Sequence, residues 1–160
     1  MSDSRMTTDR APRLIIPALG PLYAIIRPLA WPLLRIAAGA MLMPHGAQKL
    51  FGAFGGGGLA GTAGFFQKMG LEPAMPLAIL AGSAEFFGGL LVAIGLLTRP
   101  AALACVAVMA VAVFHVHWAK GFFVTEGGFE FAALWGFMLL AIAFKGGGRW
   151  SVDRALSREF

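Results

Sequence analysis

Three long stretches of this chain are almost free of charged side chains, and this feature constrains the fold more than any other. Residues 77–97, 100–118 and 131–144 contain Glu85 as their only Asp, Glu, Lys or Arg residue. Over the whole chain 58% of the residues are hydrophobic and 13% are charged, whereas soluble domains average about 25% charged residues. A membrane-spanning helix needs about 20 mainly apolar residues. The sequence therefore predicts an integral membrane protein of the all-α class.

We expect a bundle of four membrane-spanning helices. Prolines at positions 17, 21, 28 and 32 are predicted to break any long helix before the first span. That span should begin near Pro28 or Pro32, positions that suit the first turn of a helix. The turn between the second and third spans is predicted at residues 98–100, and the fourth span is somewhat short. The predicted spans cover residues 28–54, 76–97, 100–118 and 129–145.

The segments outside the spans carry most of the positive charge. Residues 1–27 form a polar, proline-rich segment at the amino terminus, and residues 146–160 form a tail at the carboxy terminus. Three lysines occupy the loops on the opposite side, namely Lys49, Lys68 and Lys120. Nine basic residues lie on the side of the termini: Arg5, Arg10, Arg13, Arg27, Arg99, Lys145, Arg149, Arg154 and Arg158. Because Lys and Arg are enriched in cytoplasmic loops, both termini are predicted to be cytoplasmic.

The net charge of +5 does not require a nucleic acid partner. Nucleic acid binding needs basic residues gathered on one exposed face, whereas here they lie between apolar segments. The single cysteine, Cys105, excludes an intramolecular disulfide, a CxxC redox pair and a zinc–cysteine cluster. No histidine pair has the HExxH spacing, and Lys49 would oppose a bound cation, so we expect no metal centre.

Several ionisable side chains lie inside or at the ends of the predicted spans. A charged group at the bilayer centre costs about 2.5 to 3.5 kcal/mol on insertion scales, so such groups usually face the interior of the bundle. We therefore interpret them as a polar site and not as lipid-facing residues. The group comprises Arg35, His45, Lys49, Glu85, His115, His117 and Glu130.

Helical geometry suggests how some of these groups meet. Glu85 shares a helix face with the small residues Gly82 and Gly89, which allow another helix to approach closely. Gly46 lies on the same stripe of the first span as Arg35. A rise of about 1.5 Å per residue places Glu85 and His45 at similar depths below the outer surface. Glu85 could pair either with Arg35 or with His45 and Lys49.

The two histidines of the third span are predicted to have different roles. His115 and His117 lie two residues apart, which places them on roughly opposite sides of a helix. One of them should be interfacial and the other functional. Glu130 lies 13 residues beyond His117 on the same outer side, so these two side chains can meet.

Several motifs resemble the DoxX family of small four-span bacterial membrane proteins. The similarity covers about residues 33–145 and includes "LLRIAAGAMLMPHGAQKLFG", "AEFFGGLLVAIG" and "HVHWAKGFFVTEGGFE". The resemblance favours His117 over His115, adds Gly88 and Gly121 to the set of matching positions, and implies the bacterial plasma (inner) membrane. The longer amino-terminal extension and Pro44 before the histidine depart from the family pattern. The family is similar to the DoxD-type membrane subunit of thiosulfate:quinone oxidoreductase.

The function that we predict is a redox-linked membrane subunit with a polar cavity toward the outer side. Its ligand would be a quinone or another small oxidisable molecule, and its electrons would come from a partner protein. Two alternatives remain open: a small-solute or proton-coupled transporter, and a structural scaffold for a redox complex. Homo-oligomerisation is also left open. The predicted roles are substrate binding for Arg35, His45 and Lys49, proton transfer for Glu85, His117 and Glu130, and helix packing for Gly46, Gly82, Gly88 and Gly89.

Overall fold

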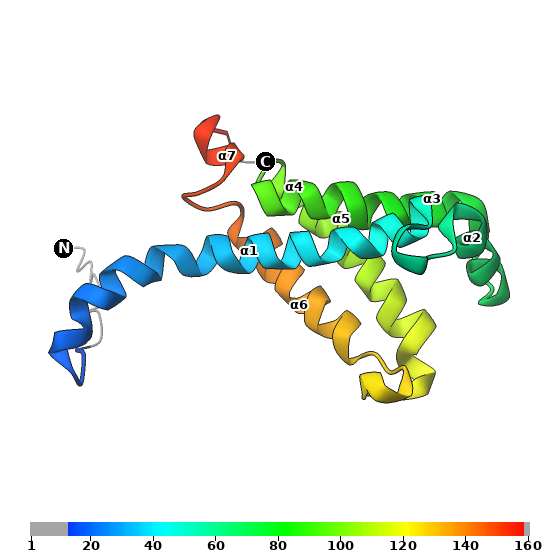
Figure 1. The fold of residues 1–160 in the computed structure, drawn as a ribbon, viewed down its shortest axis with the longest axis horizontal. Coiled ribbons are helices and arrows are strands. Elements are labelled where there is room, and N and C mark those ends of the chain that lie inside the picture. The colour runs from blue at the N-terminus through cyan, green and yellow to red at the C-terminus, as the bar shows by residue number, and fades with distance from the viewer. Residues whose placement is uncertain (1–12, 159–160) are drawn as a thin grey trace, which may run out of the picture.

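The computed structural model describes residues 13–158, and within this range the fold contains helices and no strands (Figure 1). The described segments, in chain order, are η1 Pro17–Leu19, α1 Gly20–Phe51, η2 Ala53–Gly55, α2 Gly58–Lys68, α3 Ala74–Ser83, η3 Ala84–Gly88, α4 Gly89–Ile94, α5 Thr98–Val111, η4 Ala112–His117, η5 Trp118–Lys120, η6 Val124–Glu126, α6 Glu130–Lys145 and α7 Val152–Ala155. The bundle is formed by α1, by α3 with η3 and α4, by α5 with η4, and by α6, and short helices lie at its ends.

Helix α1 is longer than the sequence predicted. It begins at Gly20 and continues through Pro28 and Pro32, so the prediction that these prolines break a long helix is wrong. Each internal proline removes one backbone hydrogen bond, a loss that membrane helices tolerate when neighbouring groups compensate for it. The first buried residue of α1 is Arg35, and the amino-terminal end of α1 extends beyond the other helices (Figure 1).

The second and third bundle helices each contain a π-helical segment. Segments α3, η3 and α4 run consecutively from Ala74 to Ile94, and η3 is π-helical. Segments α5 and η4 continue in the same way from Thr98 to His117, and η4 is π-helical. Glu85 lies in η3, and His115 and His117 lie in η4. Single π-helical turns within α-helices often mark functional sites.

Within residues 13–158, three helices are long and apolar enough to cross a membrane: Pro17–Phe51, Ala74–Ile94 and Thr98–Lys120. Helix α6 has 16 residues, fewer than the roughly 20 that a straight span needs. It nevertheless runs alongside α5. Its first turn lies near the end of η4, and its last turn accepts hydrogen bonds from Arg99 at the beginning of α5. Helix α6 therefore covers most of the length of its neighbour.

The bundle core consists of small and aliphatic side chains from α1, α4, α5 and α6. Leu42, Val92, Leu139 and Ile142 are among its fully buried members, together with the thiol of Cys105. Large apolar side chains occupy the outer surfaces of the same helices instead, as expected of helices that face lipid. The core therefore fixes the helix contacts, and the exposed apolar surface suits the bilayer.

Helix α2 forms a second packing unit with α3. Its 11 residues run from Gly58 to Lys68. The Thr62 hydroxyl donates to the carbonyl of Gly58 within the helix. Phe66 of α2 packs against Ala78 and Ala81 of α3. The loop after the first span is therefore a folded helix against the bundle.

The carboxy-terminal tail folds back onto the bundle. The Trp31 indole donates to the carbonyl of Gly146 at 3.0 Å, and the backbone N–H of Asp153 donates to Gly95 at 2.8 Å. Figure 1 shows α7 beside the end of α4. The tail is thus a fixed part of the structure.

Candidate functional site

The centre of the candidate site is an ion pair between α1 and η3. The Lys49 Nζ atom lies 2.5 Å from Oε2 of Glu85. The carboxylate side chain is 4% exposed, whereas the lysine side chain is 27% exposed. Of the two pairings that the sequence left open, the structure contains the one with Lys49. Glu85 is therefore a buried anion whose cation reaches the surface of the bundle.

Two glycines bring the helices that carry this ion pair close together. A Cβ atom on Gly46 of α1 would collide with the backbone of Gly82 and with Phe86. A Cβ atom on Gly82 would come within 2.7 Å of the Leu50 side chain. These glycines thus allow Lys49 to reach across the helix contact.

Gly88 and Gly89 also lie at close helix contacts. A Cβ atom on Gly89 would come within 2.8 Å of the Gly39 carbonyl of α1. A Cβ atom on Gly88 would lie 3.0 Å from Sγ of Cys105. The segment that follows Glu85 is therefore packed against α1 on one side and α5 on another.

A cavity of about 650 Å³ is lined by residues of α1, α5, η4 and α6 and of the loop before α6. Its wall is mainly apolar and contains two of the predicted site residues, His45 and His117. Trp135 of α6 also lines it, with its ring centroid 6.1 Å from that of His45 in an edge-to-face arrangement. The lining also includes Met41, Leu42, Met109, Ala112, Val124, Phe131, Ala132, Leu134 and Met138.

His45 connects the cavity to the ion pair. It precedes Lys49 by one helical turn on α1 and lies close enough to Glu85 for an electrostatic interaction. Its side chain is exposed, so the cavity opens at the surface of the bundle. Pockets for small molecules are commonly concave, mainly apolar and supplied with a few polar groups. The cavity has this composition.

His117 is oriented by the loop that closes the cavity. Its Nδ1 atom lies 2.7 Å from the carbonyl oxygen of Gly127. Since a carbonyl only accepts hydrogen bonds, Nδ1 carries the proton, and Nε2 of the neutral ring keeps a lone pair. Glu130 supports the same loop, because its carboxylate accepts a hydrogen bond from the N–H of Val124 at 3.0 Å. Glu130 and His117 thus meet through the loop, with no direct hydrogen bond between them within residues 13–158.

His115 lies on another side of the same segment. Its Nε2 atom is 2.8 Å from the carbonyl oxygen of Met69, in the turn after α2. His115 does not line the cavity. The two histidines therefore have separate surroundings, and His117 is the one at the candidate site.

Arg35 lies away from the cavity, at the end of the bundle where the tail docks. It is 1% exposed, and its guanidinium donates to the carbonyls of Val92 at 3.3 Å and Trp150 at 2.6 Å. Gly95, which has a φ of +75°, makes room for it, because a Cβ atom there would overlap the guanidinium. Arg35 therefore holds the tail and does not contact Glu85.

Asp153, the main anchor of the tail, was not among the residues predicted from the sequence. Its carboxylate accepts hydrogen bonds from the Leu97 N–H at 2.8 Å, the Thr98 N–H at 3.0 Å and the Thr98 hydroxyl at 2.6 Å. Burial acts to raise the pKa of this carboxyl, but the donated hydrogen bonds and the Arg35 charge outweigh burial and hold the pKa below its usual value. An acidic residue in a basic, polar tail is unremarkable in sequence, and only the fold reveals its partners.

Comparison with known proteins decides the family. The DoxX family model matches residues 30–118, which include α1 from its middle turns, the ion pair and both histidines of η4. The chain belongs to the DoxX family.

Two relatives support this assignment. A Haemophilus influenzae protein described only as uncharacterized is 33% identical over 140 residues, which cover 83% of this chain and 95% of the relative. The Escherichia coli inner membrane protein YqjF is 37% identical over 106 residues, which cover 64% of this chain and 78% of the relative. No solved structure matches the chain. Together with its apolar helices, these similarities identify this DoxX protein as a multi-pass protein of the inner membrane.

Proposed function

We propose that this DoxX protein binds a quinone or a similar small apolar carbonyl compound and acts as a redox-linked membrane subunit. The observation that carries the proposal is the cavity of about 650 Å³ with an apolar wall and two histidines. Ligand pockets typically enclose about 300 to 1,000 Å³. A quinone ring suits such a wall, and its two carbonyl oxygens need hydrogen-bond partners.

The two histidines provide complementary chemistry toward such a ring. Reduction of a quinone to a quinol consumes two electrons and two protons, and oxidation releases them. In the neutral form of His117 inferred above, the Nε2 lone pair can accept a proton from a quinol hydroxyl. The protonated ring can return that proton to a quinone oxygen. His45 can donate a hydrogen bond to the second carbonyl.

We assign supporting roles to the ion pair. Glu85 and Lys49 lie next to His45, and buried ionisable groups in membrane proteins often form proton relays. In this proposal Glu85 exchanges protons with His45, and Lys49 compensates its charge. Glu130 positions the loop that holds His117. Arg35 is not part of the ligand site, since it contacts the tail.

We place the electron donor or acceptor in a partner protein. The chain has one cysteine, so it cannot cycle between a dithiol and an intramolecular disulfide. The partner would transfer electrons to or from the bound ring, while residues of this chain bind the ring and move its protons.

The proposed topology has four spans with both termini in the cytoplasm. The nine-to-three distribution of basic residues supports this orientation. Helix α6 supports the fourth span, because it extends from the end that contains His117 to the end that contains Arg99. The cavity then faces the outer half of the membrane, where a quinone can enter from the lipid.

The test is equilibrium binding of a short-chain ubiquinone to the purified protein in detergent. We expect His117→Phe to weaken binding about tenfold, the effect of losing one hydrogen bond of about 1.5 kcal/mol. His115→Phe is the matched control, since it makes the same change two residues away and outside the cavity. Equal binding by the two variants would contradict the proposal and would favour a transporter or a scaffold.

A further inference from the structure

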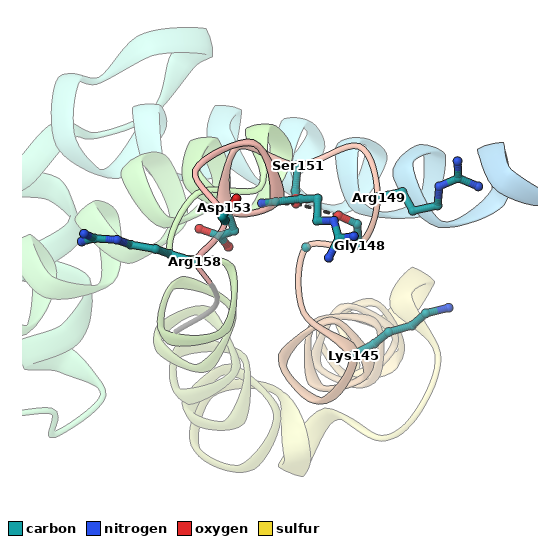
Figure 2. A pocket seen from close by; sticks show the side chains of 9 residues that line it. Lys145, Gly148, Arg149, Ser151, Asp153 and Arg158 are labelled. Carbon is teal, nitrogen blue, oxygen red and sulfur yellow. Dashed lines mark hydrogen bonds between the residues drawn. The ribbon is translucent and has the colours of Figure 1, made fainter.

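A second cavity, of about 630 Å³, lies at the opposite end of the bundle from the ligand site, under the carboxy-terminal tail. Its lining contains four basic residues and one carboxylate (Figure 2). The basic residues are Lys145, Arg149, Arg154 and Arg158, and the carboxylate belongs to Asp153. The ligand site described above uses none of them.

The carboxylate does not neutralise these cations. Asp153 already accepts three hydrogen bonds, from Leu97 and Thr98, and it lies near the Arg35 guanidinium. Its side chain is also buried, with a residue exposure of 3%. Its charge is therefore compensated by groups inside the fold, and the cavity keeps an excess of positive charge.

The basic side chains are exposed, and the part of the chain that the structure describes offers them no acidic partner. Within residues 13–158, the side chains of Arg149, Arg154 and Arg158 form no ion pair with a carboxylate. Figure 2 shows Lys145 and Arg149 extending to one side of the tail and Arg158 to the other. The positive charges thus surround the tail and are accessible to an external anion.

The backbone that carries these charges is fixed before any ligand binds. The Ser151 hydroxyl donates to the Gly148 carbonyl at 2.7 Å and accepts from the Arg154 N–H at 3.2 Å. The Trp150 carbonyl is held by Arg35. A site whose backbone is already ordered loses less conformational entropy when it binds a ligand.

The residues around the cavity are of the kinds found at the membrane–water interface. Lys145 is the last residue of α6, and its ammonium lies 4.3 Å from the centroid of the Trp31 ring. The apolar side chains of Phe144, Trp150 and Leu156 are more than half exposed nearby in the sequence. Aromatic residues at span ends mark the membrane–water interface, so a ligand here can contact the tail and the lipid at once.

We propose that this cavity binds the phosphate headgroup of an acidic phospholipid. Basic pockets at the cytoplasmic ends of membrane helices suit such headgroups. The phosphate would lie in the cavity near the basic residues that line it, and the acyl chains would extend along the exposed apolar residues of α6 and the tail. The tail would then anchor its end of the bundle to anionic lipid.

The experiment is native mass spectrometry of the full-length protein in detergent, titrated with phosphatidylglycerol or with phosphatidylcholine of the same acyl chains. The wild type is expected to bind phosphatidylglycerol at least about tenfold more tightly than phosphatidylcholine, since each nearby cation raises the affinity for an anionic lipid about fivefold. The double variant Arg149→Gln/Arg154→Gln should lose most of this preference. The control Lys68→Gln/Lys120→Gln removes the same charge from exposed positions elsewhere and should retain it.

Two results would overturn the proposal. One is an equal preference for phosphatidylglycerol in the tail variant and the control variant. The other is complete displacement of the lipid by excess inorganic phosphate, which would show that a free phosphate is the ligand. Retention of the lipid under excess phosphate supports the headgroup site.

Discussion

Lys49 and Glu85 form an ion pair across the contact between α1 and η3, and the two partners differ sharply in their access to the surface. The carboxylate is 4% exposed and the lysine side chain 27% exposed. Removal of the lysine leaves a buried anion without its cation, whereas removal of the carboxylate leaves a cation that can still reach water or lipid headgroups.

The first prediction follows from this asymmetry. Lys49→Met should lower the free energy of unfolding by about 3 kcal/mol, because an uncompensated buried charge is costly. Glu85→Gln should lower it by about 1 kcal/mol, the scale of one lost hydrogen bond. Chemical unfolding in detergent micelles measures both. The double variant Lys49→Met/Glu85→Gln should recover most of the stability that Lys49→Met loses. Equal losses in the two single variants that add up in the double variant would contradict the predicted coupling between Lys49 and Glu85.

A second prediction concerns the close contact at Gly46. Gly46→Ala should destabilise the bundle by about 1 to 3 kcal/mol, since the added methyl group meets the backbone of the facing helix. Gly64 in α2 is the matched control, because a Cβ atom there has no neighbour within 4 Å. Gly64→Ala should be neutral or slightly stabilising. Thermal unfolding compares the stability of the two variants. A similar change in both would contradict the close helix contact at Gly46.

The tail should respond to acid through Asp153. Its folded pKa lies below the unfolded value of about 3.9, so its stabilising effect is present above that value and is lost as the pH falls through the folded pKa. The stability difference between the wild type and Asp153→Asn should therefore shrink below about pH 4. Unfolding at a series of pH values measures this difference, and a difference that is constant with pH would contradict the prediction.

Thr98→Val provides an independent check of the same site. It removes the hydroxyl that donates to Asp153 at 2.6 Å. The pKa of the Asp153 carboxyl should rise, and the loss of stability in acid should begin at a higher pH than in the wild type. An unchanged acid transition in this variant would mean that the hydroxyl does not support the carboxylate.

The proposed orientation predicts from which side of the membrane each introduced cysteine is labelled. Cys105 is fully buried, so it should not react with a maleimide in the folded protein. Lys68→Cys should react with an impermeant maleimide added to intact spheroplasts. Arg158→Cys should react only after permeabilisation. Labelling of both positions from one side would contradict the four-span topology.

The hydropathy pattern was sufficient to locate the bundle helices, but their details depended on tertiary contacts. Apolar runs placed the second and third helices within a few residues of α3–α4 and α5–η4. The proline pattern led to a wrong prediction at the start of α1. Local propensity predicts that these prolines break a helix, whereas a membrane helix tolerates them. The π-helical segments have no simple sequence signature.

The sequence predicted which residues belong to the candidate site better than it predicted which of them contact one another. The cost of charge in a membrane singled out Glu85 and Lys49, which the structure pairs. The same argument grouped Arg35 with them, although its partner Trp150 lies 115 residues away in a tail that the sequence predicted to leave the bundle. Contacts between such distant segments depend on how the helices pack, and hydropathy carries no information about them.

Mass spectrometry of bound molecules tests most directly whether the cavity between α1, η4 and α6 holds a quinone. Organic extracts of the gently purified wild type should contain quinone. Extracts of Ala132→Phe, which fills the cavity, should contain little, and those of Ala37→Phe, which adds the same bulk at an exposed position outside the cavity, should match the wild type. Quinone retained equally by all three proteins, or absent from all three, would contradict the proposal.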